Sequence, residues 1–267
     1  MPNGRLRIAI QRMVPFIGYH HVLMILIMCS WILSALLLAG CTSSSSTTSS
    51  IYLLSITYHD RSDSSGAAST IFGNASTGGS VTVRAGYLGI CARAADQEPW
   101  ICASGASGLG MAFAGSGTER DPLDALQWAQ RFKSDVVFPG FVFGAIALSA
   151  LAFFGLSTFP GWHEERDTRT GSDIVVKPFP SRPVSRACLF LLAFASLFLM
   201  TSALWQHVAA ATAASIISTS TQGYLSGSVG PAAAVLVWLA LAFTAVAGIG
   251  ILVMILSIHL LDGLTDD

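Results

Sequence analysis

The chain has 267 residues, of which 52% are hydrophobic and only 11% are charged, whereas soluble domains carry about 25% charged residues. A mean hydropathy of +0.62 predicts that part of the chain is dissolved in a lipid bilayer. The formal net charge of −1 provides no basic excess for phosphate backbones, which excludes a nucleic-acid partner.

Four apolar segments are long enough to cross a bilayer, for which about 20 mostly apolar residues are needed. The first covers residues 21–40 and the second 136–159, with Pro139 in its first turn, where a missing amide donor is tolerated. Residues 187–261 contain no Asp, Glu, Lys or Arg and are too many for one helix. Residues 215–231, rich in Ser, Thr and Gly, predict a turn inside this run. This turn gives a third span at 187–211 and a fourth at 232–261.

Basic residues in short segments favour the cytoplasmic side of a membrane. They occur before the first span and between the second and third spans, at Arg5, Arg7, Arg12, Arg166, Arg169, Lys177, Arg182 and Arg186. Both termini are therefore expected in the cytoplasm. The expected cytoplasmic segments are 1–20, 160–186 and 262–267, and the expected extracellular segments are 41–135 and 212–231.

The residues Leu38-Ala39-Gly40-Cys41 after the first apolar run are similar to a bacterial lipoprotein cleavage site. The preceding segment is about twice as long as most signal peptides, and three further spans make a lipid anchor redundant. We therefore expect an uncleaved first helix.

The first extracellular segment opens with a low-complexity tract, Ser43 to Ser50, which predicts a flexible linker, with O-glycosylation as an alternative role. Further along, Asn74-Ala75-Ser76 is an N-glycosylation sequon on the side predicted to be outside. Asn74 is therefore the candidate glycosylation site.

Residues Ile51–Tyr58 and Ser80–Ile90 are rich in β-branched and aromatic side chains, which predicts two strands. The second runs into Cys91, and Trp100-Ile101-Cys102 follows a polar connection, as in a hairpin. A zinc site would need a second pair of ligands, so we expect a Cys91–Cys102 disulfide if the segment faces an oxidising compartment. A disulfide that closes a loop of that size stabilises the folded state by roughly 3 kcal/mol.

Asp121-Pro122 predicts the start of a helix, with the aspartate as cap and the proline at the first helical position. Apolar residues then recur on one face, at Leu123, Leu126, Ala129 and Phe132. This amphipathic helix is expected to run directly into the second span and to couple the sheet to the membrane helices.

Gly86-Tyr87-Leu88-Gly89-Ile90-Cys91, followed by Cys102, a pre-membrane helix and three more spans, resembles the claudin-like tetraspan superfamily. That superfamily carries a Gly-Leu-Trp in the first strand; here the tryptophan is absent, and Trp100 lies near the second cysteine. Within the superfamily, the chain is similar to the fungal mating-factor-induced family of calcium regulators and membrane-fusion proteins. The matching residues are Gly86, Tyr87, Gly89, Cys91, Trp100, Cys102, Asp121 and Pro122.

This resemblance implies a membrane α-helical fold: a four-transmembrane-helix bundle with a small disulfide-linked extracellular β-sheet. It implies a plasma-membrane protein that promotes low-affinity calcium influx and supports cell fusion or polarised growth, and the sequon at Asn74 adds the expectation of a glycoprotein. A structural scaffold that organises plasma-membrane domains, or senses wall or pH stress, is the alternative. A small transporter or channel is a third hypothesis.

A calcium site is not expected, although calcium binds six to eight oxygens and the first extracellular segment has carboxylates. Those carboxylates alternate with basic residues, which is typical of a charge-balanced surface. The acidic set is Asp96, Glu98, Glu119, Asp121, Asp124 and Asp135, and the basic set is Arg93, Arg120, Arg131 and Lys133.

Catalysis is not expected either, because no zincin motif or nucleophile elbow is present. We therefore expect no cofactor, no metal and no small-molecule substrate. The spans lack ionisable residues apart from histidines near their ends, which argues against a conduction path in one subunit. The expected partners are the lipid bilayer and a calcium channel or another copy of the chain. Small residues at four-residue spacing allow either packing within the bundle or such a contact: Gly140, Gly144, Ala240, Thr244 and Gly248.

Overall fold

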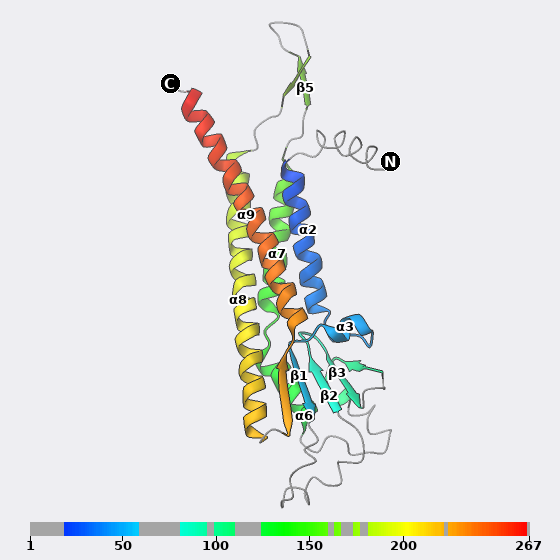
Figure 1. Ribbon diagram of the computed structural model, residues 1–267. Helices are drawn as coiled ribbons and strands as arrows, with labels where there is room; N and C mark the ends of the chain where they lie inside the picture. The colour runs from blue at the N-terminus through cyan, green and yellow to red at the C-terminus, as the bar shows by residue number, and fades with distance from the viewer. Residues whose placement is uncertain are drawn as a thin grey trace, which may run out of the picture. The chain divides into compact units, whose positions relative to one another are not determined.

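The computed structural model describes residues 19–58, 81–94, 99–109, 124–159, 163–166, 173–176, 181–221 and 224–265. The chain divides into two compact units. The first comprises Met1–Trp31, Phe143–Phe198 and Ala240–Asp267, and the second comprises Ile32–Val142 and Leu199–Leu239. Figure 1 shows the helices and strands of both units.

Four helices are long and apolar enough to cross a membrane: α2 (Tyr19–Leu38), α7 (Gly140–Ser157), α8 (Arg182–Ser220) and α9 (Pro231–Thr265). Their most apolar stretches have mean hydropathies between 2.0 and 2.6. Each overlaps one of the four predicted spans. The chain is therefore a multi-pass membrane protein.

The helix ends differ from the predicted span ends, most of all at the end of α8 and the start of α7. Helix α8 continues to Ser220, past residue 211, and the turn predicted from residue 215 begins only near Thr221. The hydroxyls of Thr219 and Ser220 donate to carbonyl oxygens four residues earlier, so these side chains are satisfied on the helix itself. Helix α7 begins at Gly140, so Pro139 lies before its first turn rather than in it.

The first unit has an apolar core made by all four helices. Its buried members are Leu23 and Ile27 of α2, Ala152 and Leu156 of α7, Cys188 and Leu192 of α8, and Ala247 and Ile251 of α9, with Phe159. Glycine allows close approach here, because a Cβ on Gly155 would lie 2.5 Å from the Cys188 sulfur. Small residues at helix contacts thus serve packing within the unit.

Polar contacts also join the helices of the first unit. The buried Ser30 hydroxyl donates to the carbonyl oxygen of Ala240 at 3.0 Å and lies 2.8 Å from the Thr244 hydroxyl. The Trp31 indole donates to the Ser149 hydroxyl at 2.7 Å. These bonds satisfy polar groups in a region where water is scarce. A separate hairpin, β5 (His163–Arg166) and β6 (Asp173–Val176), lies in the loop predicted to be cytoplasmic.

The second unit contains a five-stranded antiparallel sheet with the order β4-β3-β2-β1-β7. Its strands are β1 (Leu54–Tyr58), β2 (Val81–Ala85), β3 (Ile90–Ala94), β4 (Ile101–Ala103) and β7 (Leu225–Val229). One face is apolar and buried, with Leu54, Ile56, Val83, Ala85, Ile90, Ala92 and Leu225. Strand β7, which the sequence did not predict, pairs with β1 and lies beside it in Figure 1.

The strand predicted over Ser80–Ile90 is wrong as a single element. It is divided into β2 and β3 by a tight turn in which the Gly86 amide donates to the Gly89 carbonyl oxygen at 2.9 Å. The predicted hairpin between the Cys91 strand and the Cys102 strand is confirmed, since β3 pairs with β4 and Cys91 lies opposite Cys102.

The flexible linker predicted for Ser43 to Ser50 is also wrong. Residues Ser46–Ser50 form the short helix α3, whose first turn is capped by the Ser45 hydroxyl, which accepts from the Thr48 amide. The Thr48 hydroxyl in turn donates to the Ser43 carbonyl oxygen at 2.8 Å. Hydrogen bonds from serine and threonine side chains to the local backbone therefore order this segment, which has no hydrophobic core of its own.

The pre-membrane helix exists but does not run directly into α7. It consists of α6 (Ala125–Arg131) and a π-helical turn, η1 (Phe132–Val136), and α6 packs against β1, β2 and β3. Val137 is extended, and two residues later Pro139 interrupts the helix, because proline lacks an amide donor and disfavours helical backbone before it. Asp121, Pro122 and Leu123 lie outside the described residues.

The hydrogen bond between Ser30 and Thr244 provides a test of packing in the first unit. We expect Ser30→Ala and Thr244→Val to be coupled by about 0.6 kcal/mol in a double-mutant cycle of unfolding in detergent. Ser257 bonds only to its own helix, at the Met254 carbonyl oxygen, so Ser257→Ala serves as control and should show no coupling to Thr244→Val. Equal coupling in both cycles would contradict the predicted interhelical bond.

Candidate functional site

The turn between β2 and β3 is held against the backbone that follows α2. A Cβ on Gly86 would lie 2.4 Å from the Gly40 carbonyl oxygen, and one on Gly89 would lie 1.8 Å from the Cys41 carbonyl oxygen. A Cβ on Gly40 would lie 2.4 Å from the carbonyl oxygen of Ile51. Three glycines therefore allow backbone to pack on backbone, and any side chain at these positions would force the segments apart.

Tyr87, inside the same turn, connects it to α8. Its side chain is buried, and its hydroxyl lies 3.1 Å from the Ser202 hydroxyl and donates to the Gln206 side-chain oxygen at 3.2 Å. Burial raises the pKa of Tyr87, and the bond to Ser202 lowers it by less. The phenol therefore remains neutral and acts as a hydrogen-bonding anchor on α8.

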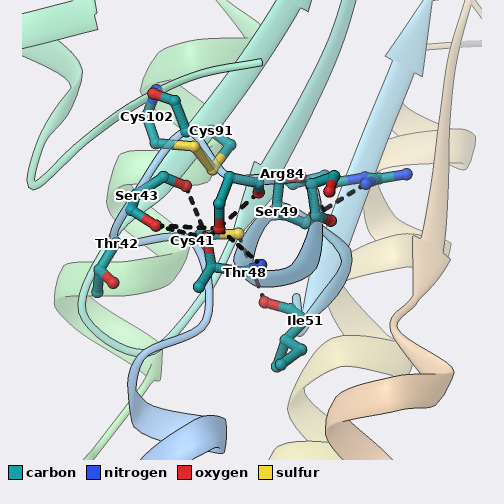
Figure 2. The surroundings of a disulfide bond; sticks show 12 residues. Cys41, Thr42, Ser43, Thr48, Ser49, Ile51, Arg84, Cys91 and Cys102 are labelled. Carbon is teal, nitrogen blue, oxygen red and sulfur yellow. Dashed lines mark hydrogen bonds between the residues drawn. A yellow bond between two sulfur atoms is a disulfide. The ribbon is translucent and has the colours of Figure 1, made fainter. Parts of the chain in front are cut away.

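The Cys91–Cys102 disulfide covalently joins β3 to β4, with the two Cα atoms 4.0 Å apart (Figure 2). A third cysteine, Cys41, lies nearby and is fully buried. Burial raises the pKa of the Cys41 thiol to about 12, although the charge of Arg84 and the backbone of Cys91 lower it. The thiol is therefore protonated and enclosed, which makes it unsuited to act as a nucleophile or to accept a lipid.

The segment that contains α3 is attached to this end of the sheet by hydrogen bonds between backbone and side-chain groups, some of which Figure 2 shows. The Cys41 amide donates to the Thr48 carbonyl oxygen at 2.9 Å, and the Cys102 amide donates to the Ser44 hydroxyl at 3.3 Å. Arg84 donates from Nη1 to the Ser49 carbonyl oxygen at 2.9 Å. The tract of serines and threonines is thus bonded to β2 through Arg84 and to β4 through one of the two disulfide cysteines.

Trp100 lies between two arginine side chains on the polar face of the sheet. The guanidinium carbon of Arg84 is 4.1 Å from its ring centroid, and that of Arg93 is 4.7 Å away. Arg84 also stacks on Tyr52 at 4.5 Å. Burial lowers the pKa of Arg84, and the positive charge of Arg93 lowers it further. Cation–π contacts therefore offset part of the cost of holding these charges together.

Six of the predicted motif residues are brought together in this site: Gly86, Tyr87, Gly89, Cys91, Trp100 and Cys102. The sequence did not predict their main partners, which are Gly40, Tyr52, Arg84, Ser202 and Gln206. Only Arg84 left a signal, as a charged residue inside an alternating apolar strand.

The remaining predicted residues are of two kinds. The sequon at Asn74, the helix start at Asp121-Pro122, and Asp96, Glu98 and Glu119 lie outside the described residues. Asp124 and Asp135 are exposed. Within the part of the chain that the structure describes, no three His, Cys, Asp or Glu side chains are grouped to hold a metal ion. The arrangement supports mechanical attachment of the sheet.

Because of the backbone contact at Gly89, we expect a single added methyl group to lower the stability of the protein strongly. Gly89→Ala should lower the free energy of unfolding by about 1–3 kcal/mol, because the Cβ would meet a backbone oxygen that cannot rotate away. A Cβ at Gly105 would lie 3.4 Å from its nearest neighbour, an atom of the flexible Gln130 side chain. Gly105→Ala should therefore change the free energy of unfolding by less than about 0.5 kcal/mol. Thermal unfolding of both purified variants is the measurement. Equal stability would rule out the close contact.

Because the Cys41 thiol is enclosed, we expect it to react slowly with thiol reagents and expect the protein to lose stability at alkaline pH. At pH 7 only about one thiol in 10⁵ is ionised, so maleimide should label Cys41 in the intact protein only after unfolding, as read by peptide mass mapping. Its folded pKa exceeds the ordinary value of 9.0, so its contribution to stability is complete below pH 9 and is lost as the pH rises towards 12. Rapid labelling of Cys41 in the folded protein would contradict this assignment.

Comparison with known proteins places the chain in a family. Neither a curated protein nor a solved structure matches the chain. A family model described as "Ca2+ regulator and membrane fusion protein Fig1" matches residues 68–257, which include β2, β3, β4, β7, α7, α8 and most of α9. This family is one of regulators and membrane-fusion proteins and is not a known enzyme family. The match covers more than half of the chain, and the chain therefore belongs to the Fig1 family of Ca2+ regulators and membrane fusion proteins.

Proposed function

We propose that the chain is a plasma-membrane protein that promotes low-affinity calcium influx and supports membrane fusion during mating or polarised growth, and that it acts through partner proteins. Membership of the Fig1 family carries this proposal, because calcium regulation and membrane fusion are the two activities in the family's description. Low-affinity influx as the form of calcium regulation, mating or polarised growth as the setting, and action through partner proteins go beyond that description and are proposed here.

The composition of the long helices supports action through a partner. No Asp, Glu, Lys or Arg occurs in α2, in α7, or in α8 and α9 between residues 187 and 261. Ion pathways through membranes usually carry such residues. A separate channel, or several copies of the chain around a shared pathway, is therefore the proposed route for calcium.

The sheet supports the proposed topology. Strand β7, between α8 and α9, pairs with β1, between α2 and α7, so both segments lie on the same side of the membrane. A disulfide in that sheet favours an oxidising compartment. We therefore propose that residues 41–135 and 212–231 are extracellular and that both termini are cytoplasmic.

Four long helices with a small disulfide-linked sheet also support a claudin-like fold, which we propose for the chain. A scaffold that organises membrane domains, without a role in calcium entry, is the alternative function for such a fold. The two functions differ in what happens to calcium when the protein is removed.

Calcium uptake in cells that lack the protein, followed by re-expression of variants, tests the proposed function. Loss of the protein should lower uptake and cell fusion, and the double variant Cys91→Ser/Cys102→Ser should fail to restore them, because β4 would be released. Tyr87→Phe removes only the hydroxyl that binds Ser202 and Gln206, and should restore uptake partly.

Cys29→Ser is the matched control, since Cys29 is a free cysteine on α2 and should restore uptake fully. The amount of each variant at the cell surface must be measured alongside, so that lost activity is separated from lost protein. Normal uptake and fusion without the protein would refute the regulator, and stable membrane patches in the same cells would favour the scaffold.

A further inference from the structure

Helix α8 is longer than a bilayer requires. Its 39 residues rise about 58 Å, whereas the hydrocarbon core of a bilayer is about 30 Å thick. Counted from Arg186, the last Lys or Arg of α8, about 20 residues cross that core, and the count ends at Gln206. The composition of α8 changes at the same place: every Leu, Phe and Met of the helix lies before Trp205, and residues 206–220 are mostly Ala, Ser and Thr.

Trp205, at this change in composition, has an apolar side and a polar side. Its side chain is 53% exposed, and its indole nitrogen donates to the Val136 carbonyl oxygen at 2.9 Å. The ring is thus open to the surroundings, while its polar group is satisfied by backbone. Tryptophan is enriched at membrane–water interfaces because it combines an apolar ring with one hydrogen-bond donor.

The segment that accepts this hydrogen bond changes from polar to apolar at the same point. Just before Val136, Asp135 is exposed. Just after it, Phe138 is 56% exposed and packs edge-on against Phe141 at 5.1 Å, and the 18 residues of α7 that begin at Gly140 carry no charge. Two segments far apart in the sequence therefore have a polar-to-apolar boundary at one level, and the bond from Trp205 joins them there.

We propose that Trp205 and Phe138 form a surface that docks into the headgroup interface of a phospholipid bilayer, and that residues 206–220 of α8 lie outside that bilayer. A lipid surface is the occupant because the exposed aromatic side chains continue directly into the exposed apolar side chains of two candidate spans, α7 and α8. The surface goes beyond the proposed function and does not depend on it, since it is tested without calcium or cell fusion.

The membrane surface then crosses α8 at Trp205 rather than at residue 211, the span end expected from the sequence. About 22 Å of helix remains outside the bilayer. This outer part of α8 supports the sheet, because a Cβ on Gly227 of β7 would lie only 2.5 Å from the Ala214 Cα.

Single cysteines along α8, in protein reconstituted into phosphatidylcholine nanodiscs, test the boundary. A charged maleimide that does not enter lipid is the probe, and it reacts with the thiolate, which forms in water and is disfavoured in hydrocarbon. Val208→Cys and Ile216→Cys should be labelled about tenfold faster or more than Phe194→Cys. The wild-type side chains at these three positions are 61%, 50% and 55% exposed, so protection reports lipid and not burial in the protein.

The anchoring role of Trp205 is tested at its neighbour Leu204, which is 47% exposed. Leu204→Cys alone should be protected. Adding Trp205→Ala should raise its labelling rate about threefold or more, because the ring that fixes the depth of α8 is removed. Trp205→Tyr is the matched control and should preserve protection, since tyrosine also combines an apolar ring with a polar group.

The unmodified protein, whose free cysteines are Cys29, Cys41 and Cys188, gives the background labelling. An intact Cys91–Cys102 disulfide, mapped under non-reducing conditions, verifies the fold of each variant.

Three results would overturn the proposal. If Val208→Cys is protected as strongly as Phe194→Cys, the boundary does not lie at Trp205. If Phe194→Cys is labelled as fast as Ile216→Cys, the exposed face of α8 does not meet lipid. If Leu204→Cys stays equally protected with Trp205→Ala and with Trp205→Tyr, the indole ring does not anchor the helix.

Discussion

Direct contact between two backbone segments is the constraint on which the five-stranded sheet depends. The turn from Gly86 to Gly89 rests on Gly40 and Cys41 with no room for a Cβ between them. Because α2 ends at Leu38, this contact connects the sheet to the chain within three residues of the end of a membrane helix. The disulfide and the α3 segment begin from this contact, since Cys91 follows Gly89 by two residues and the Cys41 amide donates to the Thr48 carbonyl oxygen.

The remaining attachments distribute the sheet over other parts of the second unit. Tyr87 reaches α8 through Ser202 and Gln206, and α6 packs against β1, β2 and β3. A buried phenol bonded to two polar side chains specifies one position on α8, whereas apolar packing alone would tolerate sliding. Six of the residues that resemble the family motif, those in the site, are thus explained by attachment of the sheet to the rest of the second unit.

Apolar length predicted the four spans well, because lipid imposes a strong and simple requirement on sequence. The disulfide was also predictable, from two cysteines in adjacent strand-like segments. Strand β7 was not, because Leu225–Val229 is short and rich in Ser and Gly and becomes a strand only by pairing with β1. The fold of Ser43–Ser50 escaped prediction for a related reason: its order comes from hydroxyl-to-backbone bonds, which composition does not reveal.

The order of the strands has a consequence for synthesis of the chain. Strands β1 to β4 are complete by Ala103, but β1 has its second neighbour only when Val229 has been made. During translation of the intervening residues, which include the helices α7 and α8, the free edge of β1 can pair with other chains. Insertion into the membrane must therefore keep pace with folding outside it, and a pause in translation between residues 103 and 225 would lengthen the period in which nascent chains are prone to aggregate.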